Sequence, residues 1–153
     1  MSVHVRLATV DDAESMDALN RTEMPENYPI DVWRTILSDY WSSSFVAHND
    51  DGELIGYILT IGEYNFYNFS RQAHVASLTV KEKYRCHGVG TTLLKTSLDR
   101  VKNYYNIRCC HLNVRVDNDI AKRLYERIGF VVKSKSTCYY SDSTDAFVMY
   151  IQL

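Results

Sequence analysis

The 153-residue sequence has no apolar run approaching the roughly 18 residues of a membrane span, and it has little excess charge of either sign. Its formal net charge of −2 provides no basic field for a nucleic-acid backbone. Its four cysteines show no CxxC spacing, so the usual zinc and redox motifs are missing. These absences predict a protein without a metal site that binds neither membranes nor nucleic acid directly.

The sequence also has few chain-breaking residues, with only six glycines and two prolines. No repeat or low-complexity stretch suggests a linker, so residues 1–153 are expected to form one domain. The opening residues MSVHVRLATVDD resemble neither a secretory signal nor a transit peptide. We therefore expect a cytoplasmic protein.

Short segments rich in β-forming residues predict strands at residues 3–7, 45–47, 54–59, 74–80, 110–114, 130–133 and 146–151. Apolar residues at helical spacing predict helices at residues 13–19, 30–40, 91–105 and 120–128. The turn signal from Asn49 to Gly52 predicts a hairpin, and residues 64–70 are expected to form a loop. Strands interleaved with helices favour an α+β or mixed α/β fold.

A glycine-bearing segment from Arg85 to Gly90 lies between a predicted strand and a predicted helix. Glycines there let backbone N–H groups approach an anion, which the positive end of a helix dipole also favours. The spacing matches neither the dinucleotide fingerprint GxGxxG nor the P-loop, because Lys95 is too far from Gly88. The segment is therefore expected to hold a pyrophosphate.

The run from Ser77 to Leu94 resembles the R/Q-x-x-G-x-G/A signature that binds acetyl-CoA in the GNAT superfamily of N-acetyltransferases. The resemblance implies a mostly antiparallel sheet of about seven strands flanked by about four helices. It also implies that the strand backbone pairs with the pantetheine arm and that the following loop holds the pyrophosphate. The residues implied are Leu78, Thr79 and Val80 in the strand, then Arg85, His87, Gly88, Val89, Gly90 and Thr91 in the loop.

A second block, residues 112–130, resembles the V-R-x-S-N-x-x-A-x-x-L-Y-x-x-x-G-F block of RimI-type and NatA-type N-terminal acetyltransferases. Asp117 stands in place of the usual serine. The resemblance implies that Asn118 contacts the cofactor and that Tyr125 lies beside its sulfur. A phenol with a pKa of about 10 stays protonated at neutral pH, so Tyr125 suits protonation of the departing thiolate.

Two further segments point to the NatA-like branch: residues 24–29 resemble its L-P-E-N-Y-P loop, and residues 139–146 resemble its Y-Y-A-D-G-E-D-A hairpin. The resemblance implies protein N-termini as substrates, and it leaves an auxiliary scaffold subunit or ribosome association open. The residues expected to bind the peptide are Pro25, Glu26, Tyr28, Tyr139 and Tyr140.

The general base has more than one candidate in the sequence. An α-ammonium group with a pKa of about 8 must lose a proton before it attacks, and Glu26 could accept that proton through water. Asn113 stands where relatives commonly carry histidine or glutamate, and it cannot act as a base. His111 shares a strand face with Asn113 and is the competing candidate.

Two alternatives to the NatA-like interpretation remain open from the sequence. One is a RimI-like ribosomal-protein alanine acetyltransferase. The other, suggested by the missing base at Asn113, is a weakly active CoA-binding subunit of an acetyltransferase complex.

Overall fold

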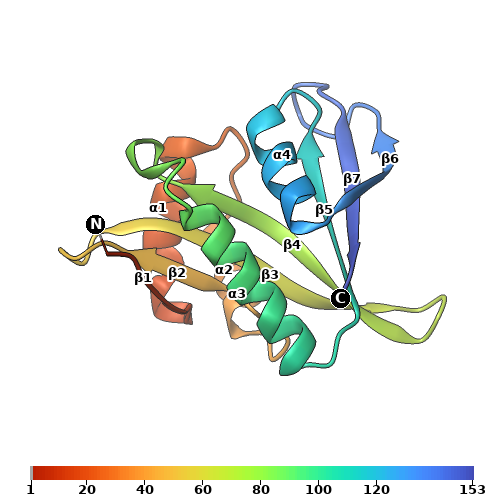
Figure 1. The fold of residues 1–153 in the computed structure, drawn as a ribbon, viewed down its shortest axis with the longest axis horizontal. Coiled ribbons are helices and arrows are strands. Elements are labelled where there is room, and N and C mark those ends of the chain that lie inside the picture. Colours follow the sequence, from red (N-terminus) through yellow and green to blue (C-terminus); the bar gives the residue numbers. More distant parts are fainter. Residues whose placement is uncertain (1) are drawn as a thin grey trace.

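The computed structural model describes residues 2–153, which form a seven-stranded sheet with the strand order β1-β2-β3-β4-β5-β7-β6 (Figure 1). The strands are β1 His4–Leu7, β2 Phe45–His48, β3 Leu54–Asn65, β4 Ser70–Val80, β5 Cys109–Arg115, β6 Val131–Ser136 and β7 Ala146–Gln152. The helices are α1 Ala13–Glu23, α2 Ile30–Ser38, α3 Val89–Asn103 and α4 Asp119–Ile128, with short 3-10 turns at Val10–Asp12 and Glu82–Tyr84. The expected class, a mixed and mostly antiparallel sheet with four α-helices, is confirmed.

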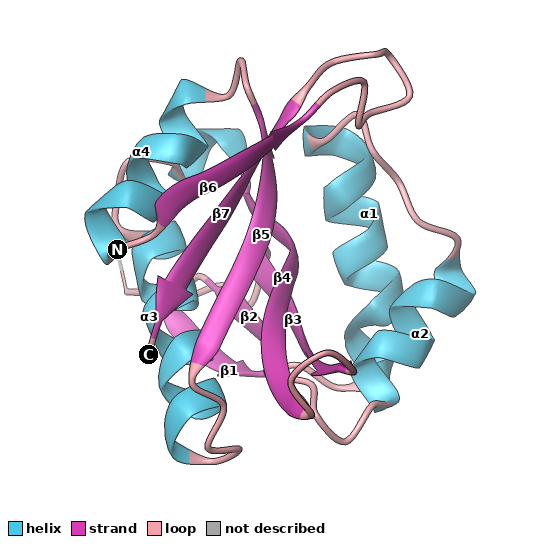
Figure 2. Ribbon diagram, turned by 90° about the vertical axis from the view of Figure 1, so that its right-hand side faces the viewer, coloured by secondary structure: helices cyan, strands magenta, loops and turns pink. Residues whose placement is uncertain are grey.

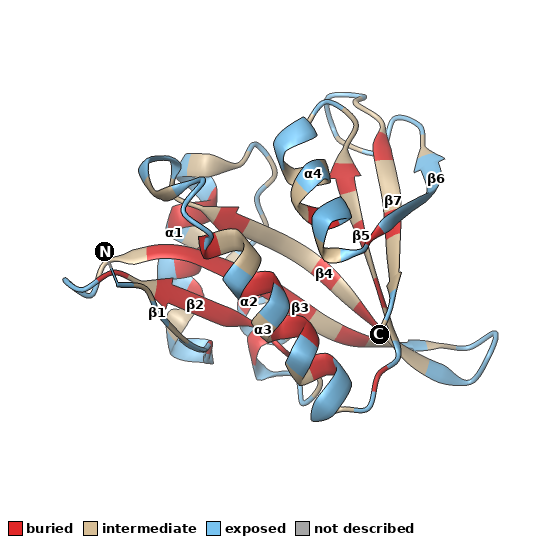
Figure 3. Ribbon diagram, viewed as in Figure 1, coloured by how far each residue is buried: buried red, intermediate tan, exposed pale blue. Residues whose placement is uncertain are grey.

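Helices cover both faces of the sheet, with α1 and α2 on one side and α3 and α4 on the other (Figure 2). On the α3 side, Leu93 and Leu94 pack into a core with Leu112 and Met149 from the strands. On the α1 side, a second core surrounds Trp33. The buried residues follow these two layers (Figure 3), so each layer of helices packs on its own face of the sheet.

The central strands β4 and β5 run parallel but pair over only three residues, Ala73–Val75 with Cys110–Leu112. Just beyond them the register between β3 and β4 shifts, because Ser77 and Val75 face consecutive residues of β3 and Ala76 is the extra residue of a bulge. After this point β4 and β5 separate (Figure 1). The separation leaves the β5-facing edge of residues 76–80 without a strand partner.

The sequence predicted the strands on either side of residues 64–70 to be shorter than they are. β3 continues to Asn65 and β4 begins at Ser70, so only residues 66–69 turn the chain. The two strands form a long hairpin that extends away from the body of the sheet (Figure 1). None of the helices formed by residues 2–153 combines the length and apolar character needed to cross a bilayer.

The paired segment of β5 should be the most sensitive part of the sheet. Leu112, with a relative exposure of 1%, fills the core directly below the point of separation. Leu112→Ala should lower the free energy of unfolding by about 2–5 kcal/mol, since it removes buried apolar surface and leaves a cavity. Val132→Ala, at a position in β6 that is 44% exposed, is the control and should cost about 1 kcal/mol or less. Urea denaturation followed by circular dichroism measures both, and equal losses would contradict this account of the core.

Candidate active site

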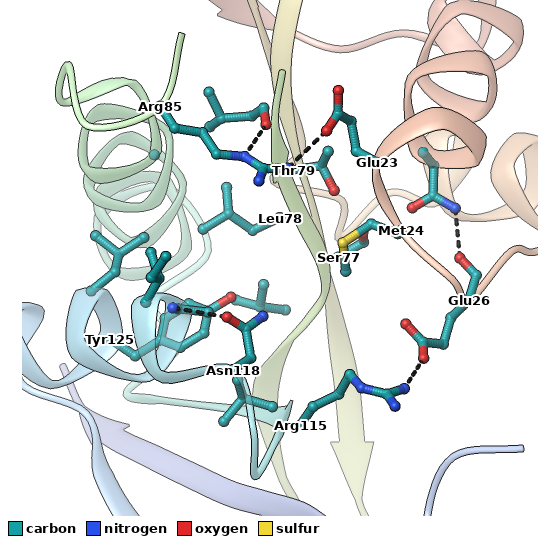
Figure 4. A pocket seen from close by; sticks show the side chains of 18 of the residues that line it. Glu23, Met24, Glu26, Ser77, Leu78, Thr79, Arg85, Arg115, Asn118 and Tyr125 are labelled. Atoms are coloured by element: carbon teal, nitrogen blue, oxygen red, sulfur yellow. Dashed lines mark hydrogen bonds and ion pairs between the residues drawn. The ribbon is translucent and has the colours of Figure 1, made fainter. Parts of the chain in front are cut away.

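The space opened by the separation of β4 from β5 is a cleft of about 440 Å³. The N-terminus of α3 and the face of α4 form one wall, and the α1–α2 loop and the β6–β7 loop form the other (Figure 4). Residues expected from the sequence that line the cleft are Pro25, Glu26, Tyr28, Leu78, Thr79, Val80, Arg85, Gly88, Val89, Gly90, Thr91, Asn113, Asn118, Tyr125, Tyr139 and Tyr140. His87 and His111 are not among the residues that line it.

The α3 end of the cleft has the form of an anion cradle. Gly88 is the residue that caps α3, and its φ of 81° lies in the left-handed region that favours glycine. The first intrahelical acceptor is the carbonyl of Gly88, bound by Thr92 N at 3.0 Å, so the preceding amides of the first turn have no helical partner. Those N–H groups and the helix dipole suit a pyrophosphate.

Arg85 lies at the mouth of this cradle. Its guanidinium donates to the Val80 carbonyl at 2.9 Å and to the Glu23 carboxylate at 2.8 Å (Figure 4). His87 lies outside the cleft with its Nδ1 2.7 Å from the Arg85 carbonyl oxygen. His87 is therefore not one of the residues that line the cleft, and its contact with the cofactor stays a prediction.

α4 contributes two of the expected residues. The Asn118 side chain caps the helix by accepting from Ala121 N at 3.2 Å. Tyr125 is only 7% exposed, and burial is the main cause that raises the pKa of its phenol. Among residues 2–153 no protein group forms a hydrogen bond with that hydroxyl, which lines the cleft as a protonated donor.

The opposite wall is organised around Arg115, at the end of β5. Its guanidinium forms ion pairs with Glu26 in the α1–α2 loop and Asp142 in the β6–β7 loop, and it lies 4.7 Å from the centre of the Tyr140 ring. The pairing holds the pKa of Asp142 at about 2 and, with Asp142 as the main cause, raises the pKa of Arg115. Nearby, Asn113 donates to the Tyr139 hydroxyl at 3.3 Å. Arg115 therefore joins two loops that are far apart in sequence.

Glu26 is held from two directions. The buried Asn20 donates to the Glu26 backbone carbonyl at 2.7 Å, and Arg115 binds its carboxylate (Figure 4). Glu26 is therefore fixed in the wall of the cleft by its backbone and its side chain together.

His74 also lines the cleft and was not selected from the sequence, where it is one residue of a predicted strand. Burial, and next the charge of His111, lowers its pKa, so the imidazole is neutral near pH 7. Its Nδ1 is buried and has no hydrogen-bond partner among the described residues. A histidine in the strand that precedes the glycine loop was the available signal.

His111 does share a strand face with Asn113, as expected, but it lies one step before the last paired residue, Leu112. Its Nε2 is 3.1 Å from Glu63 and its ring stacks on His74 at 4.5 Å. It is not among the residues that line the cleft, although His74, its direct partner in β4, is. The role of His111 as a base stays a prediction from the sequence, now for a residue that does not line the cleft.

Comparison with known proteins places the chain in a family. The model of the acetyltransferase (GNAT) family matches residues 13–130. The chain is 37% identical to an N-alpha-acetyltransferase of Sulfurisphaera tokodaii, over 95% of this chain and 90% of that protein.

Solved structures of similar chains agree with the match to this family. Ard1 from Thermoplasma volcanium is 27% identical with a TM-score of 0.86, covering 100% of this chain and 99% of that one. A chain of the NatC complex bound to Gag peptide and CoA gives a TM-score of 0.93 at 23% identity, which shows a shared fold over 100% of this chain and 99% of that one. The protein belongs to the acetyltransferase (GNAT) family.

Proposed function

We propose that the protein transfers the acetyl group of acetyl-CoA to the α-amino group of protein N-termini. The observation that carries this proposal is the cleft itself. One of its walls is an anion cradle beside a protonated tyrosine, and the other combines an acidic side chain with several tyrosines. The relative of Sulfurisphaera tokodaii, named an N-alpha-acetyltransferase, supports the same activity.

The residues of the first wall fit acetyl-CoA. Gly88 and Gly90 keep side chains away from the cradle, and the apolar Leu78 lies between the cradle and Tyr125 (Figure 4). The carbonyl of Val80 accepts from Arg85 on the cleft side, and alternate residues of a strand point their backbone groups to the same edge. The N–H of Leu78 therefore faces the cleft, where it can polarise an acetyl carbonyl. Acetyl-CoA supplies an activated thioester when bound.

We assign the proton transfers to groups on opposite walls. Glu26 attracts the substrate ammonium, and His74 accepts its proton directly or through one water molecule. The free amine then attacks the acetyl carbonyl, and Tyr125 donates its proton to the departing thiolate. His74 replaces the base that Asn113 cannot provide, which argues against a catalytically weak subunit.

The wall formed by the α1–α2 and β6–β7 loops, called the peptide wall below, favours the NatA-like interpretation over a small-amine or RimI-like enzyme. Tyr28 donates to the Ala76 carbonyl at 3.4 Å, and the paired rings of Tyr139 and Tyr140 lie 4.9 Å apart between centres. These groups form a surface that can hold a peptide backbone beside the cleft. Four free cysteines suit the proposed cytoplasmic location. Association with a scaffold subunit or the ribosome stays a prediction from the resemblance.

The proposed function is tested by acetyl transfer to peptides that carry both a free α-amine and an internal lysine. Mass spectrometry should find the acetyl group on the N-terminus, because the lysine stem would not place its amine beside His74. The same peptide with a blocked N-terminus is the control and should remain unmodified. Dominant lysine acetylation would overturn the N-terminal assignment.

The cradle is tested by Gly88→Asp. The added carboxylate would lie where the pyrophosphate charges are expected, so acetyl-CoA binding should be abolished in calorimetry. Gly52→Asp is a matched control, because Gly52 also has a φ of 81° and open space where a Cβ would lie, but it belongs to the β2–β3 turn. Equal affinity of the two variants for acetyl-CoA would show that the cofactor does not bind at this loop.

The base is tested by His74→Ala, which should lower kcat by roughly 10²–10⁴-fold, and added imidazole should restore part of the loss. Glu26→Gln should mainly raise the peptide KM. Asp142→Asn breaks the other ion pair of Arg115 and isolates the effect of loosening the loop. His111→Ala and Asn113→Ala should cost much less than His74→Ala.

The opposite pattern would be a large fall in kcat for Glu26→Gln with near wild-type turnover for His74→Ala. That result would return the role of base to Glu26, as the sequence suggested.

A further inference from the structure

Three side chains capable of binding a metal gather on one face of the sheet at the edge of the cleft. His74 in β4 is directly opposite His111 in β5, and Glu63 in β3 is opposite Gln72, two residues before His74. Side chains of paired residues, and of residues two apart, point to the same face. One ligand atom from each of Glu63, His74 and His111 lies within 4.8 Å of the other two.

One histidine nitrogen in this cluster has no hydrogen-bond partner among the described residues. His111 Nε2 lies 3.1 Å from Glu63 Oε2 and 3.4 Å from Gln72 Nε2, so that nitrogen already has partners. The His74 ring stacks on His111 at 4.5 Å, yet its buried Nδ1 has no partner among the described residues. Burying an imidazole nitrogen without a hydrogen bond costs free energy. A metal ion that accepts the lone pair of that nitrogen would remove the cost.

Two imidazoles and one carboxylate are a ligand set typical of accessible zinc sites, in which water takes the fourth position. In a tetrahedral site with bonds of 2.0–2.1 Å, neighbouring ligand atoms are about 3.4 Å apart. Glu63 Oε2 and His111 Nε2 are 3.1 Å apart and so are near this spacing. The other ligand atoms lie within 4.8 Å, so side-chain movements of about 1.4 Å or less bring them to it. The Glu63 side chain is 43% exposed and has the freedom to move.

We propose that Glu63, His74 and His111 form a binding site for Zn²⁺ or a chemically similar divalent transition-metal ion. The consequence for catalysis rests on the proposed function. A metal bound to His74 occupies the imidazole that accepts the substrate proton, so the ion inhibits acetyl transfer. The site is distinct from the cofactor cradle, because none of its three residues belongs to the α3 or α4 wall.

Metal binding is measured first, with Zn²⁺ alone and no acetyl-CoA or peptide. Cys86 and Cys138 are exposed thiols that would also bind zinc, so both are replaced by serine in every protein compared. Calorimetry should give one Zn²⁺ per chain. Co²⁺ should give a spectrum of nitrogen and oxygen ligands without thiolate charge-transfer bands.

Glu63→Gln and His111→Ala should each weaken Zn²⁺ binding at least about tenfold, since even outer-shell substitutions weaken metal binding 10–100-fold. Gln72→Ala is the matched control. It contacts His111 but provides no ligand, so it should bind Zn²⁺ at least a few-fold more tightly than the other two variants. Absence of binding, or equal binding by Glu63→Gln and the starting protein, would overturn the site.

Inhibition is measured separately at buffered free Zn²⁺, because the thiol of the CoA product also binds the ion. Zn²⁺ should reduce transfer by the starting protein, and Glu63→Gln should keep its activity at the same free concentration. Equal inhibition of both proteins would overturn the link to His74. A protein that binds Zn²⁺ but transfers no acetyl group would contradict the proposed function and leave the metal site standing.

Discussion

The separation of β4 from β5 is the constraint on which the rest of the site depends. Two parallel strands that stayed paired would satisfy each other's backbone groups and leave no space between them. Here the pairing ends after Val75 and Leu112, and the bulge at Ala76 turns β4 away. The same event frees a strand edge for a ligand and opens the cleft that other elements line. The core below the separation keeps the two strands together where they still pair.

On the peptide wall, Arg115 holds together the two loops that close this side of the cleft. Loops are the least constrained parts of a fold, and two of them meet here without a strand between them. A single guanidinium binds a carboxylate from each loop and also covers the Tyr140 ring. Because the Arg115 side chain is only 15% exposed, its charge is poorly screened by water and its partners are held firmly. Burial in turn raises the pKa of Tyr140 to about 12, so its hydroxyl remains a donor.

Local signals predicted the parts of the site that depend on local geometry. The glycines at residues 88 and 90 and the strand and helix around them could be placed because each requirement lies within a few residues. His74 was missed because its accessibility depends on where β5 leaves β4, which pairing across the sheet decides. The role of Arg115 could not be predicted from the sequence, because its contact with Glu26 spans 89 residues. His111 was placed on the correct face, but periodicity alone does not show how far along a strand a cleft extends.

The cofactor loop and the proposed acid are coupled through a close approach of two helices. A Cβ added to Gly90, in the first turn of α3, would lie 3.3 Å from a methyl carbon of Leu124 in α4. Leu124 is the neighbour of Tyr125, so the absence of a side chain at Gly90 leaves room for this part of α4 beside the cradle. A Cβ at residue 90 would require the Leu124 side chain to shift by a few tenths of an ångström, so a larger residue would disturb the contact between α3 and α4. In the proposed mechanism Gly90 thus serves two purposes, because it exposes backbone N–H groups at the cradle and permits the close approach of α3 to the helix that carries Tyr125.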